Sequence, residues 1–331
     1  MASVADRARA VAPGLGVALV VAAAATFMSE HYSAPVMLYA LLLGMGLNFL
    51  TEAERTRAGI DFAARTVLRI GVGLLGLRIG WDQVTALGWG PVGMVVALVA
   101  VTIGVSIVMA RLMGFNPLFG FLSGGATAIC GASAALALSA ALPAHERKEQ
   151  ATLYTVVGVS AMSTLAMILY PMIAHALGLD DRAAGLFIGA TIHDVAQVVG
   201  AGYAISPEAG DTATIVKLLR VAMLLPVILV AGQITRGRTP AGAARPPLLP
   251  WFVLLFVALV ALNSIVALPA PAVAFGTDIS RWCLVVSLAA IGMKTRIGDM
   301  VKLGLRPVLL MIAETVLLAA LVLGLLATGL I

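Results

Sequence analysis

Apolar runs of about twenty residues recur along the whole chain, and they constrain its fold more than any other feature. Hydrophobic residues make up 61% of the 331 positions and charged residues only 11%, and the mean hydropathy is +1.05. A soluble domain of this size cannot hide so much apolar surface. Because the runs lack the period-two alternation of barrel strands, they predict an all-α polytopic membrane protein.

We predict eleven membrane-spanning helices, separated by segments that carry charge, proline or glycine. Their predicted ranges are 13–29, 34–50, 59–80, 90–112, 117–142, 149–178, 183–205, 211–235, 249–268, 279–297 and 305–330. The first apolar run resembles a signal sequence. It is long enough to span and other spans follow, so we interpret residues 1–33 as an extra, uncleaved helix.

Basic residues are distributed unevenly between the two faces that these spans define. With a cytoplasmic N-terminus, twelve lie inside: Arg7, Arg9, Arg55, Arg57, Arg111, Arg182, Arg236, Arg238, Arg245, Lys294, Arg296 and Lys302. Four lie outside: Arg78, Arg147, Lys148 and Arg281. The positive-inside rule therefore predicts a multi-pass membrane protein with a defined orientation. Its N-terminus is expected in the cytoplasm and, after an odd number of spans, its C-terminus outside.

Two arginines lie near the middle of apolar spans, Arg69 in LLRIGVGLL and Arg220 in VKLLRVAMLL. A guanidinium keeps its charge at any ordinary pH, and a charge at the bilayer centre costs roughly 3 kcal/mol. Such a charge is normally kept only where it has a function. The pair predicts a binding site for an anion. The alternative is ion pairing, with Asp194 or Glu314 as the partner.

The same two arginines indicate an internal repeat. The segments 65–75 and 216–226 align with Arg69 on Arg220, five spans apart, and an odd offset inverts the topology. The predicted domains are the extra helix 1–33, a first repeat 34–178 (spans 2–6) and a second repeat 179–331 (spans 7–11). Inverted repeats are common in secondary transporters, whose substrates bind near the midplane.

Span 5 contains a run of small and hydroxyl-bearing residues, SGGATAICGAS at 123–133. Each glycine costs a helix about 1 kcal/mol relative to alanine, so the three glycines predict an interruption. A broken helix exposes N–H groups at a positive half-helix end, which suits an anion. The alternative is close helix packing through small residues. The candidate substrate-binding residues of this run are Gly125, Thr127, Cys130, Gly131 and Ser133.

Span 7 carries a polar cluster in the string GATIHDVAQVVGAG. His193 and Gln197 are four residues apart and are expected to share a helical face. We assign His193 and Asp194 to ion coupling, because one titrates near neutral pH and the other could carry a proton or sodium. Gln197 is assigned to substrate binding. The alternative is a polar pair that locks helices together.

Other charged residues leave their roles open. Lys217 is expected to reach the outer interface, whereas Glu314 fits a proton relay and a structural pair equally well. Lys294 and Arg296 are interpreted as cytoplasmic anchors at the end of span 10, and the inner mouth of an anion path is the alternative.

Four strings carry a resemblance to a known family: LLRIGVGLLGLRIG, ATAICGASAALA, GATIHDVAQVVGAG and AAIGMKTRI. They resemble the YeiH-type bacterial membrane proteins, which carry the provisional label of sulfate exporters. The resemblance extends from span 2 to span 11, and the family usually has Glu where this chain has Asp194. It implies the superfamily of cation/proton antiporters and anion transporters, and a location in the bacterial inner membrane. That fold has a core domain with two crossed, discontinuous helices, which the resemblance assigns to spans 5 and 10, and a flatter panel domain.

These observations predict a secondary active transporter that exports a small anion, such as sulfate, a sulfonate or a carboxylate, by alternating access. The alternative is a cation/proton antiporter with Asp194 as ion carrier and structural arginines. An intramembrane enzyme that uses Cys130 or Ser133 with His193 is a weaker hypothesis, because no nucleophile motif surrounds them.

The expected partners follow from this interpretation. They are the small anion, a proton or sodium as coupling ion, and the lipid bilayer; a homodimer is one assembly that the sequence allows. We expect no enzymatic activity, no cofactor, no metal and no nucleic acid. The isoelectric point near 9.6 fits cationic loops beside anionic lipid.

Overall fold

The computed structural model describes residues 4–32, 36–77, 79, 85, 88–142, 148–234, 251–266, 268–295 and 304–329. All regular secondary structure within these ranges is helical, which confirms the predicted class. Contacts divide the chain into two compact units. Unit 1 comprises 1–86, 199–206 and 251–296, and unit 2 comprises 87–198, 207–250 and 297–331. The predicted inverted repeats are a statement about symmetry, which the division into compact units does not test, so they stay a prediction.

Six helices of the described residues are long and apolar enough to cross a membrane: Ala8–Tyr32, Gly90–Leu112, Gln150–Ala176, Pro207–Ala231, Ala270–Lys294 and Leu305–Ala327. Shorter apolar helices occur at Val36–Gly46, Val195–Ile205 and Trp251–Ile265. The count of eleven spans therefore stays a prediction. Several residues used to predict the orientation lie outside the described ranges: Arg78, Arg147, Arg236, Arg238, Arg245, Arg296 and Lys302.

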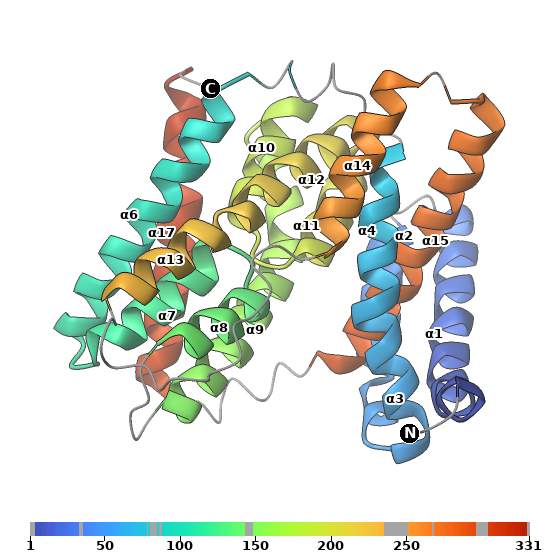
Figure 1. Ribbon diagram of the computed structural model, residues 1–331, viewed down its shortest axis with the longest axis horizontal. Coiled ribbons are helices and arrows are strands. Elements are labelled where there is room, and N and C mark those ends of the chain that lie inside the picture. Colours follow the sequence, from blue (N-terminus) through green and yellow to red (C-terminus); the bar gives the residue numbers. More distant parts are fainter. Residues whose placement is uncertain are drawn as a thin grey trace. The chain divides into compact units, whose positions relative to one another are not determined.

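Unit 1 is built from long and short helical segments that pack through small residues. Its elements are α1 (Val4–Tyr32), α2 (Val36–Gly46), η1 (Asn48–Thr51), α3 (Glu54–Phe62), η2 (Ala63–Val67), α4 (Leu68–Leu74), η3 (Leu75–Leu77), α14 (Trp251–Ile265) and α15 (Ala270–Lys294). Helices α2 and α15 lie side by side (Figure 1). A Cβ atom at Gly44 would lie 2.2 Å from the carbonyl oxygen of Ala289, so only glycine allows this approach.

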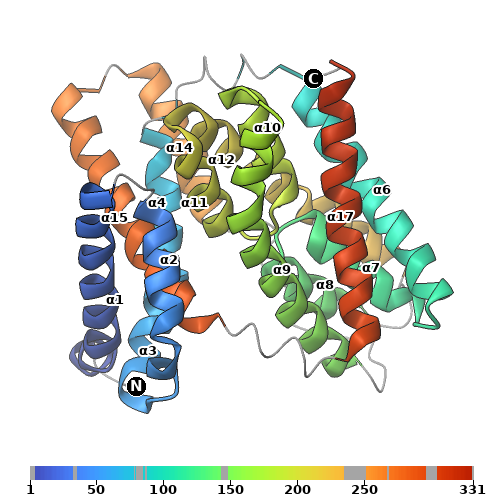
Figure 2. The ribbon, with the colours of Figure 1, turned by 180° about the vertical axis from the view of Figure 1, so that it is seen from behind.

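Unit 2 contains the elements that hold the polar residues. They are α6 (Gly90–Leu112), α7 (Pro117–Ala128), α8 (Ala132–Ala141), α9 (Lys148–Ala176), α10 (Asp181–Thr191), α12 (Pro207–Ala222), α13 (Leu224–Ile234) and α17 (Leu305–Ala327). Helix α11 (Val195–Ile205) begins in unit 2 and continues into unit 1. Helix α17 packs against α6, α7, α9 and α10 (Figure 2).

The interruption predicted in span 5 is confirmed. Helix α7 ends at Ala128 and α8 begins at Ala132, and the two appear as separate segments in Figure 1. Gly131 has φ 62° and ψ −129°, a conformation that essentially only glycine adopts. Close helix packing, the alternative interpretation of residues 123–133, also occurs, at Gly124 near the end of α7. A Cβ atom at Gly124 would lie 2.5 Å from the Ser106 Cβ atom of α6.

The second discontinuous helix lies in span 7, and the assignment to span 10 is wrong. Helix α15 runs uninterrupted from Ala270 to Lys294, whereas α10 ends at Thr191 and α11 begins at Val195. A helix break frees backbone groups that must find partners in an apolar interior. In span 7 those partners are two buried cations on α12, described below, which donate hydrogen bonds to the carbonyls of residues 189, 192 and 193.

Candidate functional site

Two buried cations on α12 join the two interruptions of unit 2. Lys217 is 0% and Arg220 is 1% exposed, and together we call them the cation pair. The two residues are one helical turn apart and therefore share one face of α12.

Lys217 uses all three of its N–H donors on backbone carbonyls. Its Nζ atom lies 2.7 Å from the oxygen of Ile129, 3.0 Å from that of Ile192 and 2.5 Å from that of His193. The expectation that Lys217 reaches the outer interface is therefore wrong. The ammonium group stays inside because the interruptions offer it three oxygens that have no helical partner.

Arg220 binds the same two interruptions from the other side. Its Nε atom donates to Ala128 at 2.8 Å and its Nη2 atom to Thr127 at 2.8 Å. Its Nη1 atom donates to Gly189 at 3.1 Å and to Ile192 at 2.9 Å. These carbonyls end α7 and α10, where helix dipoles place partial negative charge. Arg220 thus binds backbone rather than Asp194 or Glu314, and no ion pair with either occurs among the described residues.

The opposite, N-terminal ends of the half-helices differ from each other. Asp194 caps α11, since its Oδ1 atom accepts from the N–H of Ala196 at 2.9 Å and its own N–H donates to Ser163 at 2.9 Å. The residue that caps α8 is Gly131, which has no side chain to offer. Ser133, in the first turn of α8, is exposed. In that first turn the backbone N–H of Ala134 faces the Cys130 thiol, so the positive end of α8 is served by a weak acceptor rather than by a carboxylate.

His193 and Gln197 do not share a helical face, because His193 lies in the interruption and Gln197 in α11. The His193 Nδ1 atom lies 3.0 Å from the oxygen of Thr127, and its Nε2 atom lies 3.0 Å from Thr315 Oγ1. Gln197 turns to α9, where its Nε2 atom donates to Thr164 Oγ1 at 2.8 Å. Its Oε1 atom is buried with no hydrogen-bond partner within the described part of the chain.

Glu314 lies on α17 and is fully buried. Three hydroxyl groups surround its carboxyl group, and we call them the hydroxyl cage. Ser123 donates to Oε1 at 2.6 Å, Thr127 donates to Oε2 at 3.1 Å, and Ser106 contacts Oε1. Of these four residues, the sequence indicated Thr127 for substrate binding and Glu314 for a proton relay or a structural pair, but neither Ser106 nor Ser123. The signal for the others was a serine in the middle of each of two apolar helices, α6 and α7.

The remaining candidate residues have varied surroundings. Cys130 is buried in the interruption and is a free thiol. Gly125 packs α7 on α8, since a Cβ atom there would lie 2.4 Å from Leu138 Cδ1. Arg69 lies on α4 in unit 1, whereas Arg220 lies in unit 2. The Arg69 side chain is exposed. No metal-binding group of three His, Cys, Asp or Glu residues occurs among the described residues.

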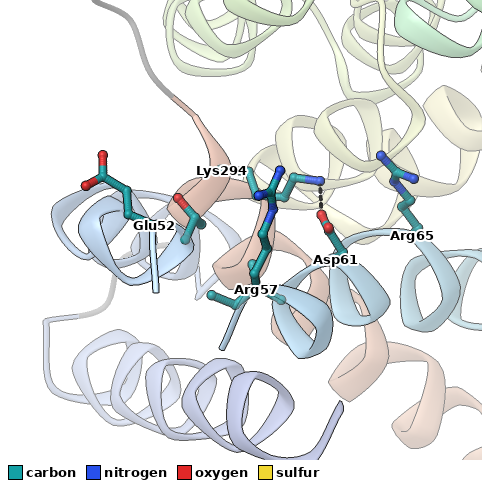
Figure 3. Close-up of a pocket in the computed structure, with 7 residues that line it drawn as sticks. Glu52, Arg57, Asp61, Arg65 and Lys294 are labelled. Atoms are coloured by element: carbon teal, nitrogen blue, oxygen red, sulfur yellow. Dashed lines mark hydrogen bonds and ion pairs between the residues drawn. The ribbon is translucent and has the colours of Figure 1, made fainter. Parts of the chain in front are cut away.

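Unit 1 holds a charged pocket of about 460 Å³ that is lined by residues of η1, α3, η2 and the end of α15. Its charged lining residues are Glu52, Arg57, Asp61, Arg65 and Lys294. Asp61 pairs with Lys294, and the Arg65 guanidinium group lies apart from this pair (Figure 3). Three cations against two acids leave the pocket with an excess of positive charge. The alternative role of Lys294, at the inner mouth of an anion path, stays a prediction.

Comparison with known proteins identifies relatives over most of the chain. The family profile described as "Conserved hypothetical protein 698" matches residues 13–311. The UPF0324 membrane protein CT0845 of Chlorobaculum tepidum is 53% identical over 94% of this chain and 88% of its own length. The UPF0324 membrane protein TauZ of Paracoccus pantotrophus is 51% identical over 94% and 93%. RB0971 of Rhizobium meliloti is 49% identical over 94% and 91%. No solved structure matches the chain significantly.

Proposed function

Since the chain belongs to the UPF0324 membrane protein family, as the resemblance to YeiH-type proteins indicated, we propose that it is a secondary active transporter that exports a small anion. Sulfate, a sulfonate or a carboxylate fits the proposal. The carrying observation is the pair of helix interruptions that the cation pair holds together inside unit 2. Interrupted helices at membrane depth are tolerated only where they are buried in protein or line a cavity, and in transporters they form substrate and ion sites.

The charge of this region favours an anion. The cation pair contributes two positive charges beside the half-buried Asp194, and the first turn of α8 adds the positive end of a helix dipole. The exposed Ser133 supplies a hydroxyl donor at that end. The Arg220 guanidinium group donates its hydrogen bonds to backbone carbonyls. It therefore shapes the site and contributes a positive electrostatic potential rather than a direct contact with the anion.

Arg69 has different chemistry to offer. It is exposed, and no hydrogen bond or ion pair to it occurs among the described residues. An exposed guanidinium group retains five donors that match the oxygens of sulfate, sulfonate or carboxylate. We therefore propose that Arg69 contacts the anion directly during transport.

Flux of radiolabelled sulfate and of a small sulfonate in proteoliposomes tests this function. Arg69→Ala and Ser133→Ala are expected to reduce flux strongly, because each removes a donor from an exposed side chain without leaving a buried group unpaired. Arg281→Ala, another exposed arginine within a long helix, is the matched control and should keep wild-type flux. Undiminished flux of every anion in both variants would contradict the anion-site proposal.

A cation/proton antiporter remains the second candidate, because two carboxyl groups lie inside unit 2. Asp194 is half-buried at the head of α11, and Glu314 is fully buried. The same liposomes distinguish the two functions. Flux that responds to sodium or to a pH gradient but to no anion would favour the antiporter.

We propose transport rather than catalysis for the Cys130, Ser133 and His193 cluster. Both ring nitrogens of His193 are engaged, one with Thr127 and one with Thr315. No hydrogen bond joins His193 to Cys130 or Ser133 within the described ranges, so the nucleophile and base of an enzyme are not in contact.

A further inference from the structure

The hydroxyl cage around Glu314 contains more short contacts than its hydroxyl protons can supply. Four of the contacts between oxygens are no longer than 3.1 Å: Ser106 to the carbonyl of Gly120 at 2.7 Å, Ser106 to Glu314 Oε1, Ser123 to Oε1 at 2.6 Å, and Thr127 to Oε2 at 3.1 Å. A fifth contact, between the hydroxyl oxygens of Ser106 and Ser123, is longer at 3.4 Å and is left out of the proton count. Each hydroxyl carries one proton, and a carbonyl or an ionised carboxylate carries none. Three hydroxyl protons cannot fill four hydrogen bonds, so the fourth proton must come from the carboxyl group.

For the four short contacts, only one assignment of protons fills every contact. Ser106 donates to the carbonyl of Gly120, which can only accept. The contact between Ser106 and Glu314 is then filled by the carboxyl proton on Oε1, which donates to Ser106 Oγ. Ser123 donates to Oε1, and Thr127 donates to Oε2. Every polar atom of the cluster has a hydrogen-bond partner in this arrangement. Each of the four contacts contains one proton, and no contact contains two.

The surroundings of Glu314 favour the neutral form for a second reason. It is 0% exposed, and no ion pair with it occurs among the described residues. Burying an ionised carboxylate without a partner is very costly, and the buried cations Lys217 and Arg220 are bound to backbone carbonyls instead. A neutral carboxyl group with three hydroxyl neighbours carries no such cost.

The helices packed around α17 bring hydroxyl groups, rather than charged groups, into contact with the Glu314 carboxyl group. Helices α6, α7, α9 and α10 pack against α17, and the groups that interact with the carboxyl group are the three hydroxyls. His193 joins the cage indirectly: its Nδ1 atom contacts the carbonyl of Thr127, and its Nε2 atom contacts Thr315, the residue after Glu314. Among the side chains that the structure describes, the other charged or titratable residues on these helices are Arg111, Lys148, Tyr154, Tyr170, His175, Asp181, Arg182 and Arg306.

We propose that Glu314, with Ser106, Ser123 and Thr127, is a buried proton-binding site, and that it carries the coupling proton in place of Asp194. Asp194 is less suited, because one of its oxygens caps α11. Thr127 connects the site to the interruption, since its hydroxyl donates to Glu314 while its carbonyl accepts from Arg220 and contacts His193. Loss of the proton would require Ser106 to donate to Glu314 instead of to Gly120, and it would place a negative charge on Glu314 next to Thr127, one residue before the end of α7. The coupling role rests on the proposed transport function, whereas the proton site does not.

Infrared spectroscopy of the purified protein tests the proton site without any transport. We expect a protonated-carboxyl C=O band at neutral pH that shifts in D₂O and is absent from Glu314→Gln. Asp194→Asn is the matched control and should keep the band. Ser106→Ala should shift the band, because the carboxyl proton loses its acceptor.

Two outcomes would overturn the proton site. One is a spectrum in which Glu314→Gln removes no such band. The other is a band that disappears when sodium chloride replaces choline chloride at constant pH, because the cage would then be a sodium site built from the same oxygens.

Proteoliposomes test the coupling role separately. Glu314→Gln keeps the neutral shape of the carboxyl group, so it should fold and exchange anion across the membrane, but flux driven by a pH gradient should fall to the level of protein-free liposomes. If a pH gradient drove normal flux in Glu314→Gln but no flux in Asp194→Asn, the coupling role of Glu314 would be overturned. The proposed transport function would remain intact. Absence of any flux in the wild type would contradict the transport function and leave the infrared result to stand by itself.

Discussion

Arg69 and Arg220 occupy similar sequence contexts, yet the two regions around them have opposite characters. Arg220 is 1% exposed and binds four backbone carbonyls at the ends of two half-helices. Arg69 lies on α4, just after the π-helical turn η2, and its side chain is exposed. One arginine therefore replaces missing backbone partners, and the other retains its donors for a ligand. The residue type and its position in an apolar span do not distinguish these roles; the surrounding backbone does.

The largest expected effect comes from removing the buried member of this comparison. Arg220→Ala leaves the carbonyls of Ala128 and Gly189 without the donors that they have now. The free energy of unfolding should fall by about 3 kcal/mol or more, since each unsatisfied buried polar group costs about 1–3 kcal/mol. Reversible unfolding by sodium dodecyl sulfate in mixed micelles measures it. Arg69→Ala is the control, and equal losses in both variants would remove the distinction between the two arginines.

A smaller loss is expected where the backbone itself makes the interruption. Gly131→Ala places a Cβ atom on a residue with φ +62°, which should cost about 1–3 kcal/mol. The nearest atom to that Cβ is His193 Cβ at 3.5 Å, so backbone strain rather than a clash is the cause. Gly16→Ala in α1, where a Cβ atom meets nothing within 4 Å, should not destabilise the protein. The same unfolding assay decides, and a Gly131→Ala protein as stable as Gly16→Ala would refute the strained geometry.

The cap of α11 gives the next effect. Asp194→Ala removes the acceptor for the N–H of Ala196 and should cost about 1 kcal/mol, whereas Asp194→Asn keeps an acceptor oxygen and should cost less. Comparing the unfolding free energies of the two variants separates capping from charge. If Asp194→Asn were the more damaging change, the negative charge beside the cation pair would matter more than the cap.

The smallest effect is expected for the ion pair of unit 1. The side chains of Lys294 and Asp61 are 33% and 40% exposed, and exposed pairs contribute only about 0–1 kcal/mol. Asp61→Asn should therefore leave unfolding almost unchanged, and raising the salt concentration should abolish any difference. A loss comparable with that of Arg220→Ala would show that solvent does not screen this pocket.

Much of the fold could be predicted from sequence, because long apolar runs leave few alternatives to membrane helices. The interruption in span 5 was also predictable, since Gly131 and its neighbours weaken a helix locally. The interruption in span 7 was not, because Ile192, His193 and Asp194 contain no glycine or proline. It exists because Lys217 and Arg220 approach from another helix and bind the freed carbonyls. The spacing of Lys217 and Arg220 on one face of α12 was the signal that could have revealed it.

The sequence by itself determined that this protein is an all-helical membrane protein of a particular family, and that its polar residues concentrate in a few apolar segments. Hydrophobicity and local backbone preference are properties of neighbouring residues, so they can be read along the chain. Only the tertiary structure decided which charges face backbone, which face solvent, and which hydroxyls surround Glu314. Hydrogen bonds between Ser106, Thr127 and Glu314 join residues up to 208 positions apart, and such partners are selected by helix packing rather than by sequence distance.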